Sequence, residues 1–342
     1  MTNKETNLQF RLAARPVGMV KDSDWQQVEE PLRELADGEM LVKVLYLSLD
    51  PAMRGWMNDA KSYIRPVGIG EVMRAGGIGV VVESKSSRFA AGDHVQGGTG
   101  VQRYWIGPAD DKSVGFRKVD ARLAPLPTYL NTLGMPGMTA YFGLIESGQP
   151  KAGETVVVSG AAGAVGQTVG QVARQLGCRV VGIAGGKDKC DFVVEQLGFD
   201  ACIDYKGGSV KDGLKQHCPD GVDVYFDNVG GEILDTVLTR INMKARIVIC
   251  GAISQYNNTT PVKGPANYLS LLVNRARMEG IVVFDYADRY HLGIAQLGQW
   301  MKEGKIHSKE DIVQGLENFP QALNMLFEGK NFGKLVLQVA SE

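Results

Sequence analysis

The sequence predicts an α/β protein in which a doubly wound parallel sheet is joined to a smaller β-rich domain. From about residue 150 onwards, short Val- and Ile-rich segments alternate with helical patterns, which is typical of βαβ units whose parallel sheet is covered on both faces. Before that point, strand-like runs are separated by many Gly and Pro residues, as in a compact β domain.

The first third of the chain holds the β-rich patterns. Met40–Ser48 and Gly77–Glu83 are its clearest strand candidates, and helical patterns begin only after Pro125-Leu126-Pro127. The tail, Phe332–Val339, has the composition of one more strand. We therefore expect a domain boundary near Pro125 and a last strand that returns to the first domain.

The second part supplies the candidate strands of the parallel sheet. They are Thr155–Ser159, Arg179–Ala184, Ala201–Asp204, Val222–Asp227, Arg246–Gly251 and Glu279–Phe284. Between the first and the second lies a helix whose apolar stripe has helical spacing, formed by Val165, Val169, Val172, Ala173 and Leu176. The number of strands matches the doubly wound fold that binds dinucleotides.

Composition narrows the class of protein. The 342 residues suffice for more than one domain, and the formal net charge of −1 provides no basic field for nucleic acid or anionic lipid. The opening residues 1–7 are polar and lack the apolar core of a signal peptide. No apolar run approaches the roughly 20 residues that cross a bilayer. We expect a cytoplasmic protein without a nucleic-acid or membrane partner.

The placement of cysteine and histidine argues against a metal site. All five cysteines lie between Cys178 and Cys250 without a CxxC pair, and the four histidines are scattered. Several of the cysteines fall in apolar segments, where buried and inert thiols are the ordinary finding. A zinc site needs several converging Cys, His or carboxylate ligands. We therefore expect no metal.

A glycine turn follows the first strand of the parallel sheet and opens its helix. Gly160 permits a tight turn, Gly163 lets the backbone approach a pyrophosphate, and Gly166 allows close packing of helix on strand. The helix N-terminus offers unpaired N–H groups to the phosphates. A GxxGxxG pattern alone is common in structural turns, but here strand, turn, helix and second strand occur in the required order. The sequence thus predicts a dinucleotide site.

The end of the second strand indicates which dinucleotide binds. An NAD site usually places Asp or Glu there to accept from the ribose 2′-hydroxyl. Here Val180–Ala184 runs into Gly185 and Gly186, followed by Lys187 and Lys189. Lysine serves as a point charge for a phosphate, so we expect NADPH/NADP. Asp188 between the lysines leaves a solvated loop as the alternative.

Motifs spread over nearly the whole chain resemble the zinc-independent branch of the medium-chain dehydrogenase/reductase superfamily, and most of all its leukotriene and prostaglandin reductases, plant alkenal reductases and bacterial curcumin reductases. These motifs are Ser48–Arg54, Gly134–Tyr141, Ala161–Gly166, Tyr225–Gly231, Cys250–Asn257 and Asn331–Lys334. The resemblance implies a GroES-like β domain at 1–126 and 307–342, a Rossmann NADP-binding domain at 127–306, a cleft between the two, and a homodimer.

The resemblance also implies which residues form the site. Lys189 resembles the family lysine at the 2′-phosphate, Tyr205 the tyrosine beside it, and Asn228 and Asn331 the asparagines that contact the cofactor. Further cofactor contacts are expected in the turn and in the adjoining loops, at Gly160, Ala162, Gly163, Ala164, Val165, Gly166, Gly185, Cys250 and Tyr256. Ala52 departs from the pattern, because many relatives have tyrosine there.

Two tyrosines are expected to carry the chemistry that the resemblance implies. That chemistry is hydride transfer from NADPH to the β-carbon of an α,β-unsaturated ketone or aldehyde. Tyr256 matches the tyrosine at the substrate carbonyl, where a hydroxyl would stabilise the developing enolate, and Tyr63 resembles a second tyrosine of the cleft. Each residue also has a purely structural interpretation. Tyr256 could be a loop tyrosine packed on Pro261, Asn228 a turn residue, and Asn331 a residue that precedes a strand.

Other functions remain as alternatives. A zinc-independent quinone oxidoreductase is the nearer one, because quinones are also conjugated carbonyl compounds. A non-catalytic NADPH-binding protein could retain the glycine turn and Lys189 without needing Tyr256. A zinc alcohol dehydrogenase shares the fold but needs Cys and His ligands from the β domain, which here contains no Cys and only His94.

Overall fold

The computed structural model describes residues 5–341 and separates into two compact units. Unit 1 contains residues 5–130, 310–330 and 335–341, and unit 2 contains Asn131–Lys309 and Asn331–Lys334. The boundaries expected after residues 126 and 306 thus move to 130 and 309, and the short segment 331–334 belongs to unit 2. Residues 1–4, part of the polar opening segment that argued against a signal peptide, lie outside the described residues.

Unit 1 is the β-rich unit. Its strands are β1 (Thr6–Leu12), β2 (Trp25–Pro31), β3 (Glu39–Ser48), β4 (Gly77–Ser84), β5 (His94–Gly97), β6 (Tyr104–Pro108), β7 (Arg117–Lys118), β14 (Glu310–Gln314) and β15 (Lys334–Gln338). Within the described chain they form a β1-β2 pair and a larger sheet with the order β14-β15-β3-β4-β5-β7, in which β6 also pairs with β3. The short helices are η1 (Asp22–Asp24), α1 (Ala52–Trp56), η2 (Leu126–Leu130) and η6 (Leu316–Asn318), and the longer one is α9 (Phe319–Glu328).

The C-terminal segment completes the core of unit 1. Strand β15 pairs antiparallel with β3, as expected for the tail, with Leu337 opposite Leu47. Helix α9 adds Phe319, which is fully buried and packs edge-on against Phe10 and Trp25 at ring distances of 5.3 and 4.9 Å. Burial of large apolar side chains is the main favourable contribution to folding, so this unit depends on both ends of the chain.

Unit 2 is built on a parallel sheet. Its strands are β8 (Thr155–Ser159), β9 (Arg179–Ala184), β10 (Ala201–Asp204), β11 (Val222–Asp227), β12 (Ile241–Ile249) and β13 (Arg277–Gly280). Their order is β10-β9-β8-β11-β12-β13, and β8 lies between β9 and β11 with parallel register on both sides. This confirms the predicted doubly wound fold. The order reverses between β8 and β11, the point at which such sheets bind ligands beyond the carboxyl ends of their strands.

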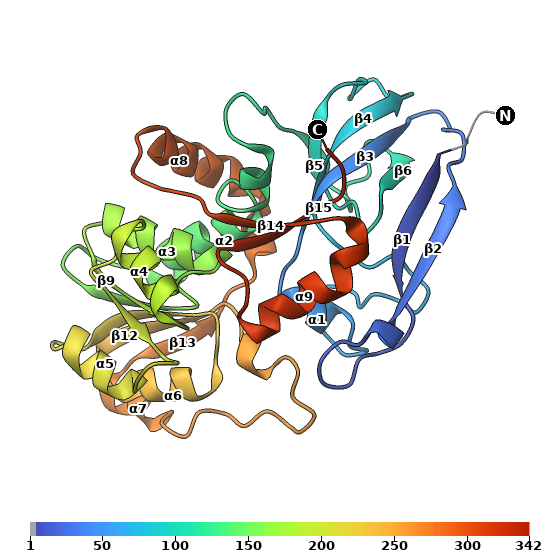
Figure 1. Cartoon of the computed structure of the whole chain (residues 1–342). Helices are drawn as coiled ribbons and strands as arrows, with labels where there is room; N and C mark the ends of the chain where they lie inside the picture. Colours follow the sequence, from blue (N-terminus) through green and yellow to red (C-terminus); the bar gives the residue numbers. More distant parts are fainter. Residues whose placement is uncertain (1–4, 342) are drawn as a thin grey trace. The chain divides into compact units, whose positions relative to one another are not determined.

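Helices cover both faces of this sheet. They are α2 (Met135–Phe142), the π-helical η3 (Gly143–Gly148), α3 (Ala164–Gln175), α4 (Lys187–Glu195), α5 (Val210–His217), α6 (Gly231–Leu238), η4 (Ile253–Gln255), α7 (Leu269–Asn274), η5 (Val283–Arg289) and α8 (Tyr290–Lys302). Figure 1 shows α3 and α4 on one face and α5, α6 and α7 on the other. No helix within residues 5–341 is long and apolar enough to cross a membrane.

One expected strand was wrong in part. Glu279–Phe284 was predicted as a strand, but β13 ends at Gly280 and Val283 opens the 3-10 helix η5. The ring of Tyr286 in η5 stacks on Phe142 at 5.2 Å. A short apolar run cannot be assigned to strand or helix by periodicity alone, and this packing favours the helix. Strand β12 also differs, since it begins at Ile241 rather than Arg246.

Candidate functional site

The glycine turn lies at the carboxyl end of β8, where the order of the sheet reverses. Gly160 has φ +61°, a conformation that side chains other than glycine rarely adopt, and helix α3 begins directly after Gly163. A Cβ on Gly166 would lie 2.2 Å from the Gly160 carbonyl oxygen. Only glycine therefore allows the helix to approach the turn, and the first N–H groups of α3 are left at the open end of the sheet.

A buried carboxylate holds the two strands that flank this turn. Asp227, at the end of β11, is fully buried, and its Oδ1 accepts hydrogen bonds from Ser159 Oγ at 3.0 Å and Tyr225 Oη at 2.8 Å. The same oxygen accepts from the backbone N–H groups of Val229 and Gly230. Burial, with the neighbouring Asp227 charge, raises the pKa of Tyr225 well above its ordinary value, so its hydroxyl remains a donor.

Sequence reasoning did not identify Asp227 or Ser159 as part of the site, although both lie in predicted strands. A buried acid directly before Asn-Val-Gly-Gly is the signal that could have revealed this network, because a buried charge needs several hydrogen-bond donors. The network fixes the turn and the following loop to the same edge of the sheet.

The two predicted cofactor asparagines are both anchored beside the turn. Asn228 Nδ2 donates to the Ser159 carbonyl oxygen at 2.7 Å. Asn331 Nδ2 donates to the Gly333 carbonyl oxygen at 2.9 Å, and Gly333 forms a parallel bridge with Gly163 of the turn. The Asn228 amide is therefore fixed by β8, whereas that of Asn331 is held by a local contact two residues further along the chain.

The end of β9 has the features that suit a ribose phosphate. Gly185 allows Tyr205 to approach, because a Cβ on Gly185 would lie 2.6 Å from the Tyr205 hydroxyl. Burial, together with the charge of Asp204, raises the pKa of Tyr205, so the hydroxyl is neutral and can donate. Asp204, at the end of β10, lies beside this corner, and its Oδ1 accepts from the backbone N–H groups of Gly186 and Lys206 at 2.7 and 2.9 Å. These bonds commit that carboxylate to the loop.

The two lysines at this corner differ in their surroundings. Lys187, Asp188 and Lys189 form the first turn of α4. Lys187 is largely exposed and forms an ion pair with Asp191, whereas Lys189 is half-buried and Asp188 is exposed to solvent. The carboxylate of Asp188 thus faces solvent, while Lys189 is the more buried of the two lysines.

The loop after β12 places Tyr256 beside the end of β11. The Tyr256 hydroxyl oxygen accepts the Ala252 N–H at 3.1 Å, and a Cβ on Gly251 would lie 2.8 Å from this oxygen. The Gly251 N–H donates to the Asp227 carbonyl oxygen, as does that of Cys250. Burial raises the pKa of the Cys250 thiol to about 12, so this thiol is neutral and not a nucleophile. The Ala252 N–H thus orients the hydroxyl of this tyrosine.

Two buried glutamines on α3 bind the last residues of unit 2 to this helix. Sequence reasoning did not identify them. Gln167 donates to the Lys309 carbonyl oxygen at 3.2 Å and accepts the Lys309 N–H at 2.9 Å. One turn further, Gln171 forms the same reciprocal pair with His307 at 2.9 and 2.7 Å. The last residues of unit 2 are thereby bound to the helix that opens at the glycine turn. The i, i+4 spacing of two glutamines in an apolar helix was the available signal.

Tyr63 and Ala52 belong to unit 1. Tyr63 has 54% of its surface exposed, and its hydroxyl accepts from Trp56 Nε1 at 3.3 Å. Ala52 is half-buried at the start of α1, whose Arg54 is buried and donates to the Pro16 carbonyl oxygen at 3.0 Å. The structure thus gathers the cofactor candidates in unit 2, while Tyr63 is held in the β-rich unit.

The residues of unit 2 fit a dinucleotide. Gly166 lets helix α3 pack closely on the turn, the helix presents its N-terminus there, and the Asn228 amide is fixed at this end of the sheet. Within residues 5–341, no group of three or more His, Cys, Asp or Glu side chains is placed to hold a metal ion.

Known proteins share these features over the full chain. Residues 8–114 match the family described as the N-terminal domain of oxidoreductase, and residues 164–297 match the family described as zinc-binding dehydrogenase. The chain is 44% identical over 344 residues to an NADPH-dependent curcumin reductase of Escherichia coli, covering 99% of each chain. It is 41% identical over 347 residues to an NADP⁺-dependent 2-alkenal reductase of Nicotiana tabacum, covering 100% of each.

A solved structure is similar throughout. The crystal structure of CurA from Vibrio vulnificus in complex with NADPH superposes with a TM-score of 0.92 at 45% identity, covering 98% of this chain and 100% of the other. The similarity therefore extends over nearly the whole chain and includes both units.

Proposed function

This chain belongs to the zinc-independent branch of the medium-chain dehydrogenase/reductase superfamily, and on that basis we propose that it uses NADPH to reduce the conjugated C=C bond of α,β-unsaturated ketones or aldehydes. The observation that carries the proposal is the Tyr256 hydroxyl, oriented by the Ala252 N–H beside the glycine-turn edge of the sheet. The full-length similarity to curcumin and 2-alkenal reductases supports the same class of reaction.

The residues of the chain bind the cofactor, orient the substrate and stabilise the charge that develops during the reaction. When bound, NADPH supplies the hydride that adds to the β-carbon of the substrate. Negative charge then develops on the substrate carbonyl oxygen, and the Tyr256 hydroxyl donates a hydrogen bond to it. A proton from water adds to the α-carbon and completes the reduction. The Tyr256 hydroxyl acts through electrostatic stabilisation of the developing negative charge. We assign Tyr63 as a second contact to the substrate.

Substitution of Tyr256 tests this mechanism. We expect Tyr256→Phe to raise the barrier by about 2.7–4 kcal/mol, or ~100- to 1000-fold in kcat/KM, the usual effect of losing one such donor. The matched control is Tyr268→Phe, since Tyr268 is an exposed tyrosine of the same unit. The decrease in NADPH absorbance with a 2-alkenal measures both. An unchanged kcat/KM in Tyr256→Phe rejects the assigned role, and no turnover by the wild type across enones rejects the reaction.

We propose Lys189 as the residue that binds the 2′-phosphate, with Tyr205 beside it. The neighbouring Lys187 is paired with Asp191 and serves as the matched control. A charge-assisted hydrogen bond contributes about 1.5–3 kcal/mol, so Lys189→Ala should weaken NADPH binding ~10- to 100-fold and leave NADH binding nearly unchanged. If Lys187→Ala and Lys189→Ala weaken NADPH binding equally, this assignment is wrong.

We also propose a homodimer formed through the β13 side of unit 2. Strand β13 is the last strand of its sheet, and exposed edge strands readily pair with another chain. Large apolar side chains of the neighbouring helices α7 and η5 are exposed as well, with 56% of Leu269, 74% of Leu272, 64% of Val273 and 41% of Phe284 accessible. Light scattering should give twice the chain mass, and Leu272→Asp should reduce it to that of one chain.

A cytoplasmic location is the last part of the proposal. All five cysteines are free thiols in the structure, and free thiols persist in reducing compartments. Fractionation of the native cells, with the protein followed by antibody, tests it.

A further inference from the structure

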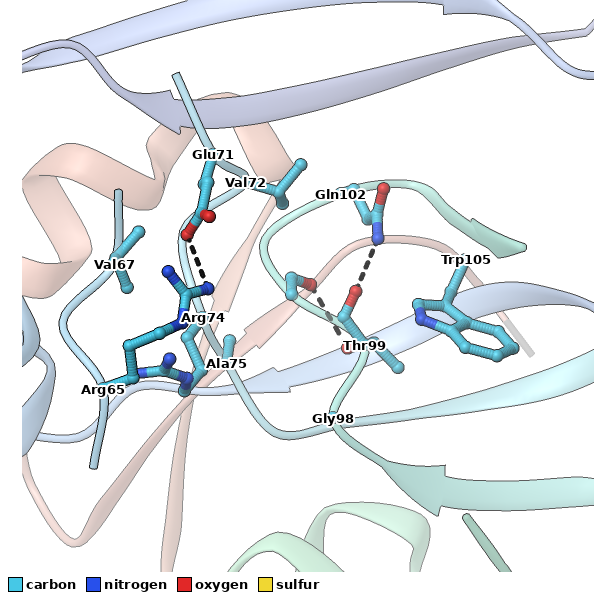
Figure 2. A pocket seen from close by; sticks show the side chains of 11 residues that line it. Arg65, Val67, Glu71, Val72, Arg74, Ala75, Gly98, Thr99, Gln102 and Trp105 are labelled. Carbon is cyan, nitrogen blue, oxygen red and sulfur yellow. Dashed lines mark hydrogen bonds and ion pairs between the residues drawn. The ribbon is translucent and has the colours of Figure 1, made fainter. Parts of the chain in front are cut away.

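The β-rich unit contains a pocket that none of the roles assigned above requires. Its volume is about 220 Å³, and it is an open pocket lined by residues between Arg65 and Trp105. Figure 2 shows Arg65 and Arg74 on one side of it and Gln102 and Trp105 on the other. Val67, Val72 and Ala75 add apolar surface to the lining, so the cavity combines charge with an apolar wall.

Arg74 is the unusual group in this pocket. Guanidinium groups carry five N–H donors, yet those of Arg74 have no acceptor among residues 5–341, and its Nη1 is enclosed by the protein. The buried Arg54 of the same unit shows the ordinary outcome, because it donates to the carbonyl oxygens of Pro16 and Gly18 and to Asn58. A buried donor without a partner costs free energy, so Arg74 is placed for an acceptor that the chain does not supply.

The charges around Arg74 leave one positive charge unbalanced. Glu71 Oε2 accepts from Arg65 Nη2 at 2.9 Å and from the Gly68 N–H at 2.8 Å. The Arg65 hydrogen bond, with that of Gly68, lowers the pKa of the Glu71 carboxyl, so Arg65 and Glu71 neutralise each other. The pocket as a whole therefore carries the single positive charge of Arg74.

The uncharged side chains of Gln102 and Thr99 in the pocket are already committed. Gln102 Nε2 donates to the Thr99 carbonyl oxygen at 2.6 Å, and its Oε1 accepts from both Asn7 and Gln9 at 3.0 Å. The Thr99 hydroxyl donates to the Gly100 carbonyl oxygen at 3.2 Å. Recognition of a ligand thus depends on Arg74. One planar guanidinium beside an apolar wall suits a carboxylate, which accepts two parallel hydrogen bonds from it.

Trp56 connects this pocket to the proposed substrate contact of unit 1. The Arg74 guanidinium lies over the Trp56 ring, 5.5 Å from its centre, and the indole Nε1 of Trp56 donates to the Tyr63 hydroxyl at 3.3 Å. Stacking fixes the plane of the guanidinium. Arg74 and Tyr63 therefore contact the same indole ring through its face and its N–H, respectively.

From this arrangement we propose that the pocket is a carboxylate subsite, in which Arg74 binds the acidic end of a conjugated aldehyde or ketone. The inference rests on the proposed reduction of conjugated carbonyl compounds. A cavity of about 220 Å³ is smaller than the roughly 300–1,000 Å³ that hold a whole drug-sized ligand, so it takes the end of a substrate rather than all of it. The substrate class is an unsaturated oxo acid.

The test compares 2-alkenals that end in a carboxylate, with spacers of increasing length, against their methyl esters. For the best spacer, the wild type should prefer the acid over the ester by about ten- to a hundredfold in kcat/KM, the usual effect of a charge-assisted hydrogen bond. Arg74→Met should remove this ratio, and Arg74→Lys should keep part of it. The matched control is Arg88→Met, because Arg88 also lies over an aromatic ring of unit 1, that of Phe89 at 4.9 Å.

Calorimetric binding of the saturated counterparts separates this inference from the proposed reaction. The saturated acid should bind the wild type at least about tenfold more tightly than its ester, and Arg74→Met should abolish the difference while its melting temperature shows that it is folded. Absence of any acid preference at every spacer, or its persistence in Arg74→Met, overturns the carboxylate subsite. If the protein reduces neither the acid nor the ester but still binds the saturated acid more tightly, only the proposed reduction is wrong.

Discussion

The two units of this protein present positive potential by opposite means. In unit 2 the glycine turn offers backbone N–H groups at the start of α3, and no side chain of the turn carries charge. In unit 1 the pocket depends on a single guanidinium, that of Arg74. A backbone site accepts any ligand with the right phosphates, whereas a side-chain site can be altered by one substitution. The pyrophosphate of the cofactor and the proposed acidic end of the substrate are thus bound by two kinds of recognition.

The largest expected effect tests whether the glycine turn keeps its geometry without the buried Asp227 carboxylate. Asp227→Ala removes the acceptor of four buried donors, each costing about 1–3 kcal/mol when left unpaired, so we expect the free energy of unfolding to fall by at least ~3 kcal/mol. Urea denaturation measures this. The exposed Asp220→Ala is the control and should change stability by less than about 0.5 kcal/mol. Equal effects would mean that the turn holds its geometry without the carboxylate.

A smaller effect is expected from crowding the turn itself. A methyl group on Gly166 meets the Gly160 carbonyl oxygen at 2.2 Å, and overpacking of this kind costs about 1–3 kcal/mol. Gly166→Ala should therefore lose both stability and NADPH affinity. Gly264→Ala serves as the control, because nothing lies within 4 Å of the added methyl group. Full NADPH affinity in Gly166→Ala, measured by fluorescence titration, would contradict the close approach of helix and turn.

The smallest expected effect is on stability and concerns the Glu154 carboxylate, which has no proposed role in binding. Burial alone would raise the pKa of Glu154, but hydrogen bonds from Arg246 and the Lys151 N–H hold it below its ordinary value. The stability that the Glu154 charge contributes is fully present above the pKa that this carboxyl has in the unfolded chain. It is lost as the pH falls through the lower pKa of the folded protein. Glu154→Gln should therefore lose about 1 kcal/mol at pH 7 and nothing in strong acid.

A matched pair controls this pH dependence. Arg277 and Glu279 lie 3.8 Å apart with 43% of each side chain exposed, so Glu279→Gln should change the stability at pH 7 by less than about 0.5 kcal/mol. Denaturation curves between pH 3 and pH 8 measure both variants. A pH-independent loss in Glu154→Gln would indicate that packing, rather than charge, explains the effect.

The sequence predicted what is local and periodic. The strand–turn–helix at Gly160 and the alternation of strands and helices are each visible within a short window, and the structure confirms the doubly wound fold. The strand expected at Glu279–Phe284 ended early because Tyr286 packs on Phe142, which lies far away in the chain. Asp227 and Arg74 were missed for the same reason, since the burial of one and the missing acceptors of the other depend on residues that the fold brings together.

The segment Asn331–Lys334 has a consequence for the synthesis of the protein. It returns to unit 2 between two stretches of unit 1. Phe319, which lies before this segment, and β15, which follows it, both enter the core of unit 1 and are among the last residues of the chain to be made. During translation, residues 131–309 can therefore fold on the ribosome while the first 130 residues wait for their partners. The N-terminal unit, made first, would be completed last, and chaperones would meet its open β3 edge throughout elongation.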